Sequence, residues 1–235
     1  IGCIAPRVRG GLVAALENGC ALIDGWGVAP RPFGPAVLAD KPEQRFNDGR
    51  VDAAGRLWVG SLTSDKANPA ATLYRLDPDG LLTEIFGGLT TSNGAAFSPD
   101  GRTFYHADTP THAIHAYDVD AAAGTLGNGR IFHQFEFGNG RPDGAAVDAE
   151  GCYWSALWDG WRIVRFSPAG ELIQTVELPV QRPTMLAFGG PDLQTAFVTS
   201  AGKNLTDAER AKQPNAGGIF TFRVDVPGLI QQDFG

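Results

Sequence analysis

A pattern that recurs every 41–50 residues constrains the fold of this chain more than any other feature of its sequence. A typical unit opens with a polar residue and glycine, alternates apolar and polar residues, turns at a second glycine, and alternates again. Because similar units follow one another at this period, the sequence predicts an array of repeated supersecondary structures. The five units begin at Ile1, Asp48, Asn93, Asp143 and Thr184.

Turn and strand signals inside the units indicate two β-hairpins per repeat. The turns at 52–55, 98–101 and 148–151 end in glycine, which adopts the positive φ that tight hairpins need. A second alternating stretch follows in four units, at 71–80, 112–120, 161–170 and 217–225. Four strands in each period are typical of a propeller blade. We therefore predict an all-β fold, a β-propeller that forms a single domain over residues 1–235.

A β-sandwich is the alternative, because it also places turns every 8–12 residues or so. The register of the repeated polar-glycine pair favours the propeller. One helix is predicted, at 206–212, where Thr206 is a suitable N-cap. This segment lies in a loop between strands and leaves the fold class unchanged.

The polar positions that open the units predict a ring of side chains around one end of the channel. In a propeller, equivalent positions of successive inner strands are far apart in sequence and close in space. The oxygen-bearing members Asp48, Asn93 and Asp143 suit a hard divalent cation, because no Cys or His is in register with them. Alternatively, these side chains only cap turns where the strands begin.

Two residues upstream of this ring add donors for a substrate. Arg45 offers a guanidinium and Asn47 an amide, which can bind sugar hydroxyls or a polarised carbonyl. The alternative for Arg45 is a surface ion pair. The histidines alternate with Tyr105 and Tyr117, which fits positions on a strand, so we do not predict a catalytic histidine.

Composition excludes several classes of partner. The net charge is -7 and the pI is near 5.0, without a basic cluster, which argues against nucleic acid and acidic membrane surfaces. No apolar run approaches the roughly 18–20 residues that cross a bilayer. The three cysteines lack a C-x-x-C spacing and are expected to be reduced thiols, which favours the cytoplasm.

The segments RFNDGRVDAAGRLWVGSL, TSNGAAFSPDGRTFYHADT and RPDGAAVDAEGCYWSALW resemble the gluconolactonase, regucalcin and luciferin-regenerating-enzyme family. The resemblance extends along essentially the whole chain and is nearest to bacterial aldonolactonases. It implies a six-bladed propeller, of which about five blades are represented here. We therefore expect an N-terminally truncated domain that lacks the first blade.

The resemblance also implies roles for the candidate site residues. Asn93 and Asp143 match the family's metal ligands, Asp143 matches its general base, and Arg45 and Asn47 match its substrate contacts. The family's third ligand is a Glu in the first blade, which has no counterpart here. Glu17 is no substitute, because it lies at the end of an inner hairpin away from the ring.

The expected function is metal-dependent hydrolysis of a sugar-acid lactone, such as gluconolactone or xylonolactone, to the open aldonic acid. The cofactor would be one divalent cation (Ca, Mg, Mn, Zn or Fe), and the partner a small sugar lactone. We expect the truncated chain to be a poor enzyme alone. The alternatives are a non-catalytic, calcium-binding regulatory propeller and a propeller-type phosphotriesterase.

Overall fold

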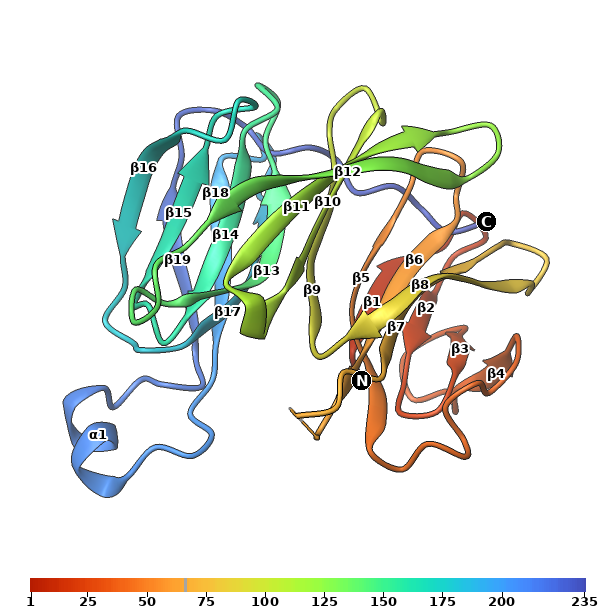
Figure 1. Ribbon diagram of the computed structural model, residues 1–235, viewed down its shortest axis with the longest axis horizontal. Coiled ribbons are helices and arrows are strands. Elements are labelled where there is room, and N and C mark those ends of the chain that lie inside the picture. Colours follow the sequence, from red (N-terminus) through yellow and green to blue (C-terminus); the bar gives the residue numbers. More distant parts are fainter. Residues whose placement is uncertain (66) are drawn as a thin grey trace.

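The strands form five antiparallel sheets in the computed structural model, which describes residues 1–65 and 67–235 (Figure 1). The inner strands β1, β5, β9, β13 and β17 contact one another in this order. Each sheet therefore is one blade of a propeller, and the predicted all-β propeller fold is confirmed.

The blades follow the sequence, with strands added outward from the inner one. The first comprises β1 (Cys3–Pro6), β2 (Leu12–Ala15), β3 (Cys20–Ile23) and β4 (Arg31–Phe33). The second comprises β5 (Gln44–Val51), β6 (Leu57–Thr63), β7 (Ala71–Leu76) and β8 (Leu82–Leu89). The third comprises β9 (Ser92–Phe97), β10 (Thr103–Asp108), β11 (Ala113–Asp120) and β12 (Thr125–Gln134). The fourth comprises β13 (Arg141–Val147), β14 (Tyr153–Trp158), β15 (Arg162–Phe166) and β16 (Leu172–Glu177).

The fifth blade has three strands among the described residues, not the four expected from the repeat. They are β17 (Pro183–Gly189), β18 (Thr195–Ser200) and β19 (Ile219–Arg223). The chain does not turn back after β19. It crosses the end of the molecule opposite the helix α1 towards the first blade (Figure 1), where Phe234 N donates to Pro6 O at 2.8 Å.

Two short helices lie outside the sheets. The 3-10 helix η1 (Thr109–Thr111) follows β10, and α1 (Asp207–Lys212) lies between β18 and β19. Thr206 caps α1 as predicted, in a capping box in which Glu209 Oε2 accepts from Thr206 N at 2.8 Å. Among the described residues, no helix is long and apolar enough to cross a membrane.

Each pair of neighbouring blades encloses a hydrophobic core, because one face of every sheet packs on the next. Pairs of buried side chains from successive blades are Val13 and Val59, Trp58 and Phe104, Tyr105 and Tyr153, and Trp154 and Leu186. The three cysteines are free thiols, and Cys20 and Cys152 are buried.

A buried aspartate closes the inner hairpin of the second and fourth blades. In the turn at 148–151, Asp148 Oδ1 accepts from the backbone N–H groups of Glu150 and Cys152 at 3.0 Å. Its other oxygen accepts from Trp154 Nε1 and Arg165 Nε, both at 2.8 Å. Asp52 forms the equivalent bonds to its turn and to Trp58. The carboxylate thus joins the turn to the core of its blade.

We predict that Asp148→Ala lowers the free energy of unfolding by about 3–5 kcal/mol, because the buried indole N–H of Trp154 and two turn N–H groups lose their acceptor and Arg165 keeps only the exposed carboxylate of Glu150. The measurement is urea denaturation. Asp100→Ala is the matched control: Asp100 occupies the exposed turn of the third blade, and its loss should cost about 1 kcal/mol or less. Equal losses for the two variants would contradict the assignment.

Candidate functional site

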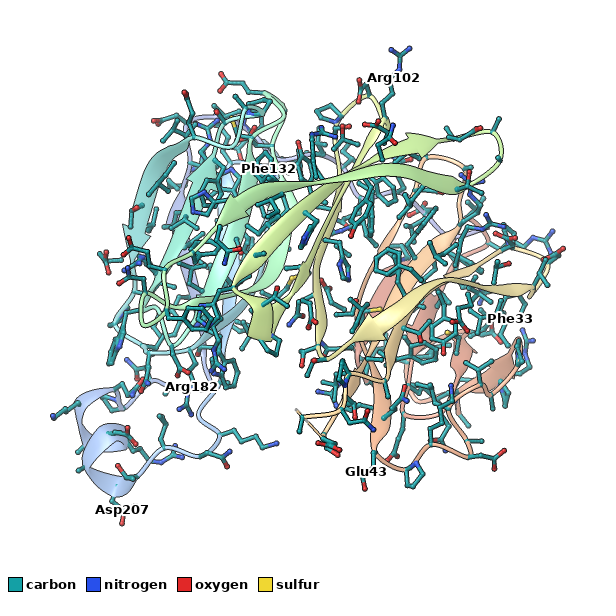
Figure 2. The ribbon with its side chains drawn as sticks, viewed as in Figure 1. Phe33, Glu43, Arg102, Phe132, Arg182 and Asp207 are labelled. Atoms are coloured by element: carbon teal, nitrogen blue, oxygen red, sulfur yellow. The ribbon has the colours of Figure 1, made fainter. Side chains whose placement is uncertain are left out.

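The candidate site is a cavity of about 480 Å³ that residues of all five inner strands line. Asn47, Asn93 and Asp143 are among the lining residues, together with Thr184 from the fifth blade. The inner strands run into the cavity from the end of the molecule that carries α1. Figure 2 shows Glu43 and Arg182, which precede β5 and β17, at this end.

A β-bulge interrupts each of the four inner strands β5, β9, β13 and β17 near the cavity. The pairing shifts between Phe46 and Gly49, between Pro142 and Ala145, and between Pro183 and Met185. In the third blade the step from Asn93 to Ala96 pairs with the shorter step from Ala107 to Tyr105, so the extra residue lies in β9. Bulges re-aim side chains where they occur, and they place the polar residues in the channel.

The bulge in β5 adds Asn47 to the ring predicted for the second blade. Asn47, Asn93 and Asp143 each lie five residues before their turn residue, whereas Asp48 lies four before Asp52. Asn47 therefore holds the equivalent position, and Asp48 lines the same cavity beside it. In the first blade, Gly2 lines the cavity, whereas Ile1, the predicted ring residue, is 83% exposed.

The Asp48 carboxylate is buried in the wall of the cavity and bonds to both β5 and β9. Its oxygens accept from Gly49 N at 2.8 Å and Ala95 N at 2.9 Å. Burial raises the pKa of Asp48, and the charge of Arg50 partly offsets this. Arg50 in turn donates to Ala95 O, Ala145 O and Gln231 Oε1, at 3.1, 2.6 and 2.5 Å. The two opposite charges lie in the wall of the cavity, which both residues line.

The two asparagines are held in a hydrogen-bonded chain across three blades. Asn47 Nδ2 donates to Asn93 Oδ1 at 2.8 Å, and Asn93 Nδ2 donates to Thr109 Oγ1 at 2.7 Å. Thr109 Oγ1 then donates to Pro142 O at 2.7 Å, next to Asp143. The chain fixes both amide orientations, so the amide oxygen of Asn93 lies on the side of Asn47.

Arg45 is linked to this chain although it is largely exposed. Its Nη1 donates to Asn47 Oδ1 at 3.1 Å and to Phe46 O at 2.8 Å. The guanidinium therefore lies at the edge of the cavity. The four predicted site residues Arg45, Asn47, Asn93 and Asp143 are gathered in one region, and their chemical roles remain predictions.

Asp143 carries the most strongly perturbed carboxyl group of the cavity. Burial raises its pKa well above the usual value, and the nearby charge of Asp48 adds to this effect. The backbone N–H of Gly144, Arg141 and Arg45 act in the opposite direction. Two carboxylates that share a poorly hydrated space need a proton or a cation between them.

The oxygen atoms of these side chains are of the type that binds a hard divalent cation. Asp143 supplies a carboxylate and Asn93 an amide oxygen, which are ligands such cations prefer, whereas the oxygen of Asn47 accepts from Arg45. No group of three or more His, Cys, Asp and Glu occurs among the described residues, so a cation here would depend on the amide oxygens. Asn93 and Asp143, with Asn47 beside them, are the residues that would hold it.

The histidines lie outside this cavity or are neutralised by burial. His106 accepts or donates a hydrogen bond with Ser92 Oγ at 2.7 Å, and burial lowers its pKa to about 3. His115 and His133 pack on aromatic rings. These contacts give His106 a structural role, and the absence of a catalytic histidine stays a prediction.

Residues that the sequence prediction missed lie around the same cavity. Thr109 orients Asn93, although nothing in the repeat marks it. Arg141 and Arg182 both pair with Asp159, at 2.6 and 2.7 Å. The two arginines could have been found from their register, because each lies two residues before a ring position, as Arg45 does.

A second cavity, of about 660 Å³, lies at the opposite end of the channel, beneath the segment that crosses to the first blade. Arg50 and Gln231 line both cavities, and their hydrogen bond separates the two. The larger cavity contains none of the predicted site residues. We therefore place the functional site in the smaller one, where the polar side chains converge.

By its fold and site, this protein is a β-propeller whose inner strands converge on one polar cavity. A family model described as SMP-30/Gluconolactonase/LRE-like region matches residues 1–202. The chain belongs to this family, which confirms the resemblance inferred from its sequence.

Individual relatives support the assignment. The chain is 41% identical over 240 residues to 6-deoxy-6-sulfogluconolactonase of Pseudomonas putida, over 100% of the chain and 80% of that protein. It is 39% identical to regucalcin of Danio rerio, over 94% of the chain and 75% of the relative. A solved structure described as a calcium-binding protein, regucalcin, of Agrobacterium tumefaciens matches with a TM-score of 0.93 and 29% identity, over 99% of the chain and 78% of that structure.

We predict that Asp143→Asn stabilises the metal-free protein at neutral pH. The raised pKa means that ionising Asp143 costs free energy in the folded state. This cost is absent below the unfolded pKa, near 4, and grows as the pH rises towards the folded pKa. The melting temperature should therefore rise by a few degrees at pH 8, where about 1 kcal/mol corresponds to roughly 2–4 °C.

The gain should vanish at about pH 4, and it should shrink when a divalent cation is added. Thermal melts from acid to neutral pH, in chelator and then with cation, measure both effects. Asp118→Asn, on the exposed face of β11, is the control. A gain of the same size at every pH would contradict the prediction.

Proposed function

We propose that this chain hydrolyses a sugar-acid lactone, an aldonolactone such as gluconolactone or xylonolactone, to the open acid with the help of one divalent cation. The observation that carries the proposal is the convergence of Asn47, Asn93 and Asp143 in one cavity. The Pseudomonas putida relative, named for a gluconolactone substrate, supports the substrate class.

Asp143 is the proposed general base. A carboxylate whose pKa is raised by burial is a stronger base than one in water, and it faces a cavity large enough for water and substrate. Asp143 would take a proton from the water that attacks the lactone carbonyl. A cation held by Asp143 and Asn93 would polarise that carbonyl and stabilise its developing negative charge.

Arg45 and Asn47 are the proposed substrate contacts. Asn47 is fixed between Arg45 and Asn93, so its amide is oriented before a ligand arrives. Donors fixed in this way lower the entropic cost of reaching the reactive geometry. Arg45, at the exposed edge of the cavity, would bind ring hydroxyl groups.

A non-catalytic, calcium-binding role is the second candidate, and the solved regucalcin described as calcium-binding favours it. The two functions share the oxygen ligands of Asn93 and Asp143. They differ in whether a bound lactone is opened. Lactonase assays with Ca²⁺, Mg²⁺, Mn²⁺, Zn²⁺ or Fe²⁺ distinguish them, because calcium binding without turnover would leave only the second.

We predict that Asp143→Asn reduces lactone hydrolysis at least about 100-fold, because general-base catalysis contributes factors of this size. The variant keeps an oxygen ligand, so cation binding should weaken less than hydrolysis. Acid release from the lactone and calorimetric cation titration provide the two measurements. Asp118→Asn is the control. Hydrolysis by Asp143→Asn that stays within about tenfold of wild type, after the spontaneous rate is subtracted, would refute the assigned role.

Arg45→Ala tests substrate recognition. We expect a higher KM or a lower kcat/KM for five- and six-membered aldonolactones, with stability within about 1 kcal/mol of wild type because the side chain is exposed. Arg130→Ala, which removes an exposed arginine of β12, is the control. Unchanged kinetics across the lactone panel would reject the role of Arg45.

A further inference from the structure

Arginine recurs two residues before the ring position in three of the blades. Arg45 precedes Asn47, Arg141 precedes Asp143, and Arg182 precedes Thr184. Two residues of extended strand span about 7 Å, so each guanidinium begins within reach of the cavity. The three arginines therefore hold a second set of equivalent positions in the repeat, two residues before the polar ring.

Arg141 and Arg182 are brought together by one carboxylate. Asp159 Oδ2 accepts from Arg141 Nη2 at 2.6 Å, and its Oδ1 accepts from Arg182 Nε at 2.7 Å. Gln181 Nε2 donates to the same Oδ1 at 3.0 Å. Asp159 lies in the loop between β14 and β15 with a φ of 60°, a conformation that few non-glycine residues adopt. The loop geometry holds the carboxylate between two strands of different blades.

Both guanidiniums are anchored, and that of Arg141 is partly exposed, whereas Arg182 is mostly buried. The Arg182 guanidinium lies 5.2 Å from the ring centre of Trp158 and donates to Lys203 O, so its plane is fixed. The side chain of Arg141 is 35% exposed, and among the described residues its guanidinium forms one hydrogen-bonded ion pair, with Asp159. Further N–H donors of Arg141 are left for a ligand.

Charges of both signs meet at this edge of the cavity. Asp159 pairs with Arg141 and Arg182, Glu209 also interacts with Arg182, and Asp143 lies near Arg141 and Arg45. Arg141 shares its paired carboxylate with Arg182, so it keeps donors for an anionic group. Hydrogen bonds from Arg182 and Arg141 outweigh the effect of burial and lower the pKa of Asp159, which keeps it ionised.

We infer that Arg141 and Arg182, oriented by Asp159, form a subsite for an anionic oxygen group, a sulfonate or a phosphate monoester, on the end of the lactone substrate away from its carbonyl. This inference rests on the proposed lactonase function and adds a substrate class to it. Planar guanidinium forks bind such groups through paired, charge-assisted hydrogen bonds. The distance from Arg141 to Asp143 along β13 is comparable with the length of a hexonolactone.

The test compares glucono-lactone with its analogues that carry a sulfonate or a phosphate in place of the C6 hydroxyl. Wild type should show a higher kcat/KM for a charged lactone than for the neutral one. In Arg141→Met and Arg182→Met the ratio of these values should fall about tenfold or more, because charge-assisted bonds are lost. Arg130→Met should leave the ratio unchanged. The two charged analogues show which oxoanion the subsite prefers.

Arg182→Lys is a second variant that is expected to fold, because it keeps the positive charge while losing the planar guanidinium. It should give an intermediate ratio with a melting temperature near that of wild type. The preference of the wild type should also shrink as the ionic strength rises, since the subsite is partly exposed.

A binding measurement separates this inference from the proposed function. Calorimetric titration with the open-chain sulfonated acid and with gluconate needs no turnover. The sulfonated acid should bind more tightly to wild type and to Arg130→Met, and this difference should disappear in Arg141→Met. Equal affinity for the two acids, or a difference that survives in both methionine variants, would overturn the subsite. Selective binding without hydrolysis of any lactone would instead overturn only the lactonase function.

Discussion

The carboxylate that closes the inner hairpin is the interaction on which the rest of this structure depends. Asp148 bonds the turn through one oxygen and the indole of Trp154 through the other, so the register of β13 against β14 is fixed by the core of its own blade. Asp52 does the same in the second blade. The residue five positions before each turn lies at the cavity, so the turn determines where its side chain is placed.

This dependence explains which parts of the molecule could be predicted from the sequence. The propeller follows from the period, because turns that end in glycine and alternating strands recur with it. The helix at Asp207–Lys212 follows from the cap that Thr206 provides. The short fifth blade could not be predicted, because the pairing of Phe234 with β1 is set by contacts distant in sequence.

The site was predicted less well than the fold, for a local reason. Asn93 and Asp143 were found because polar-glycine pairs mark them. Asp48 was assigned to the ring because it also precedes glycine, but the bulge in β5 places Asn47 at the equivalent position and buries the Asp48 carboxylate in the cavity wall. Thr109 and Asp159 had no signal, since their roles arise from loops whose conformation the repeat does not determine.

The bond between the first blade and the segment after β19 has a consequence for how this fold is acquired. Arg7 and Phe234 form a parallel bridge although they are 227 residues apart in sequence. Contacts of such high order form slowly, because a long loop must close before they stabilise anything. On the ribosome, this contact cannot form until residue 234 has emerged. The first blade must therefore wait until the chain up to Phe234, the partner that completes its core, has been made, and it is open to misassembly for that time.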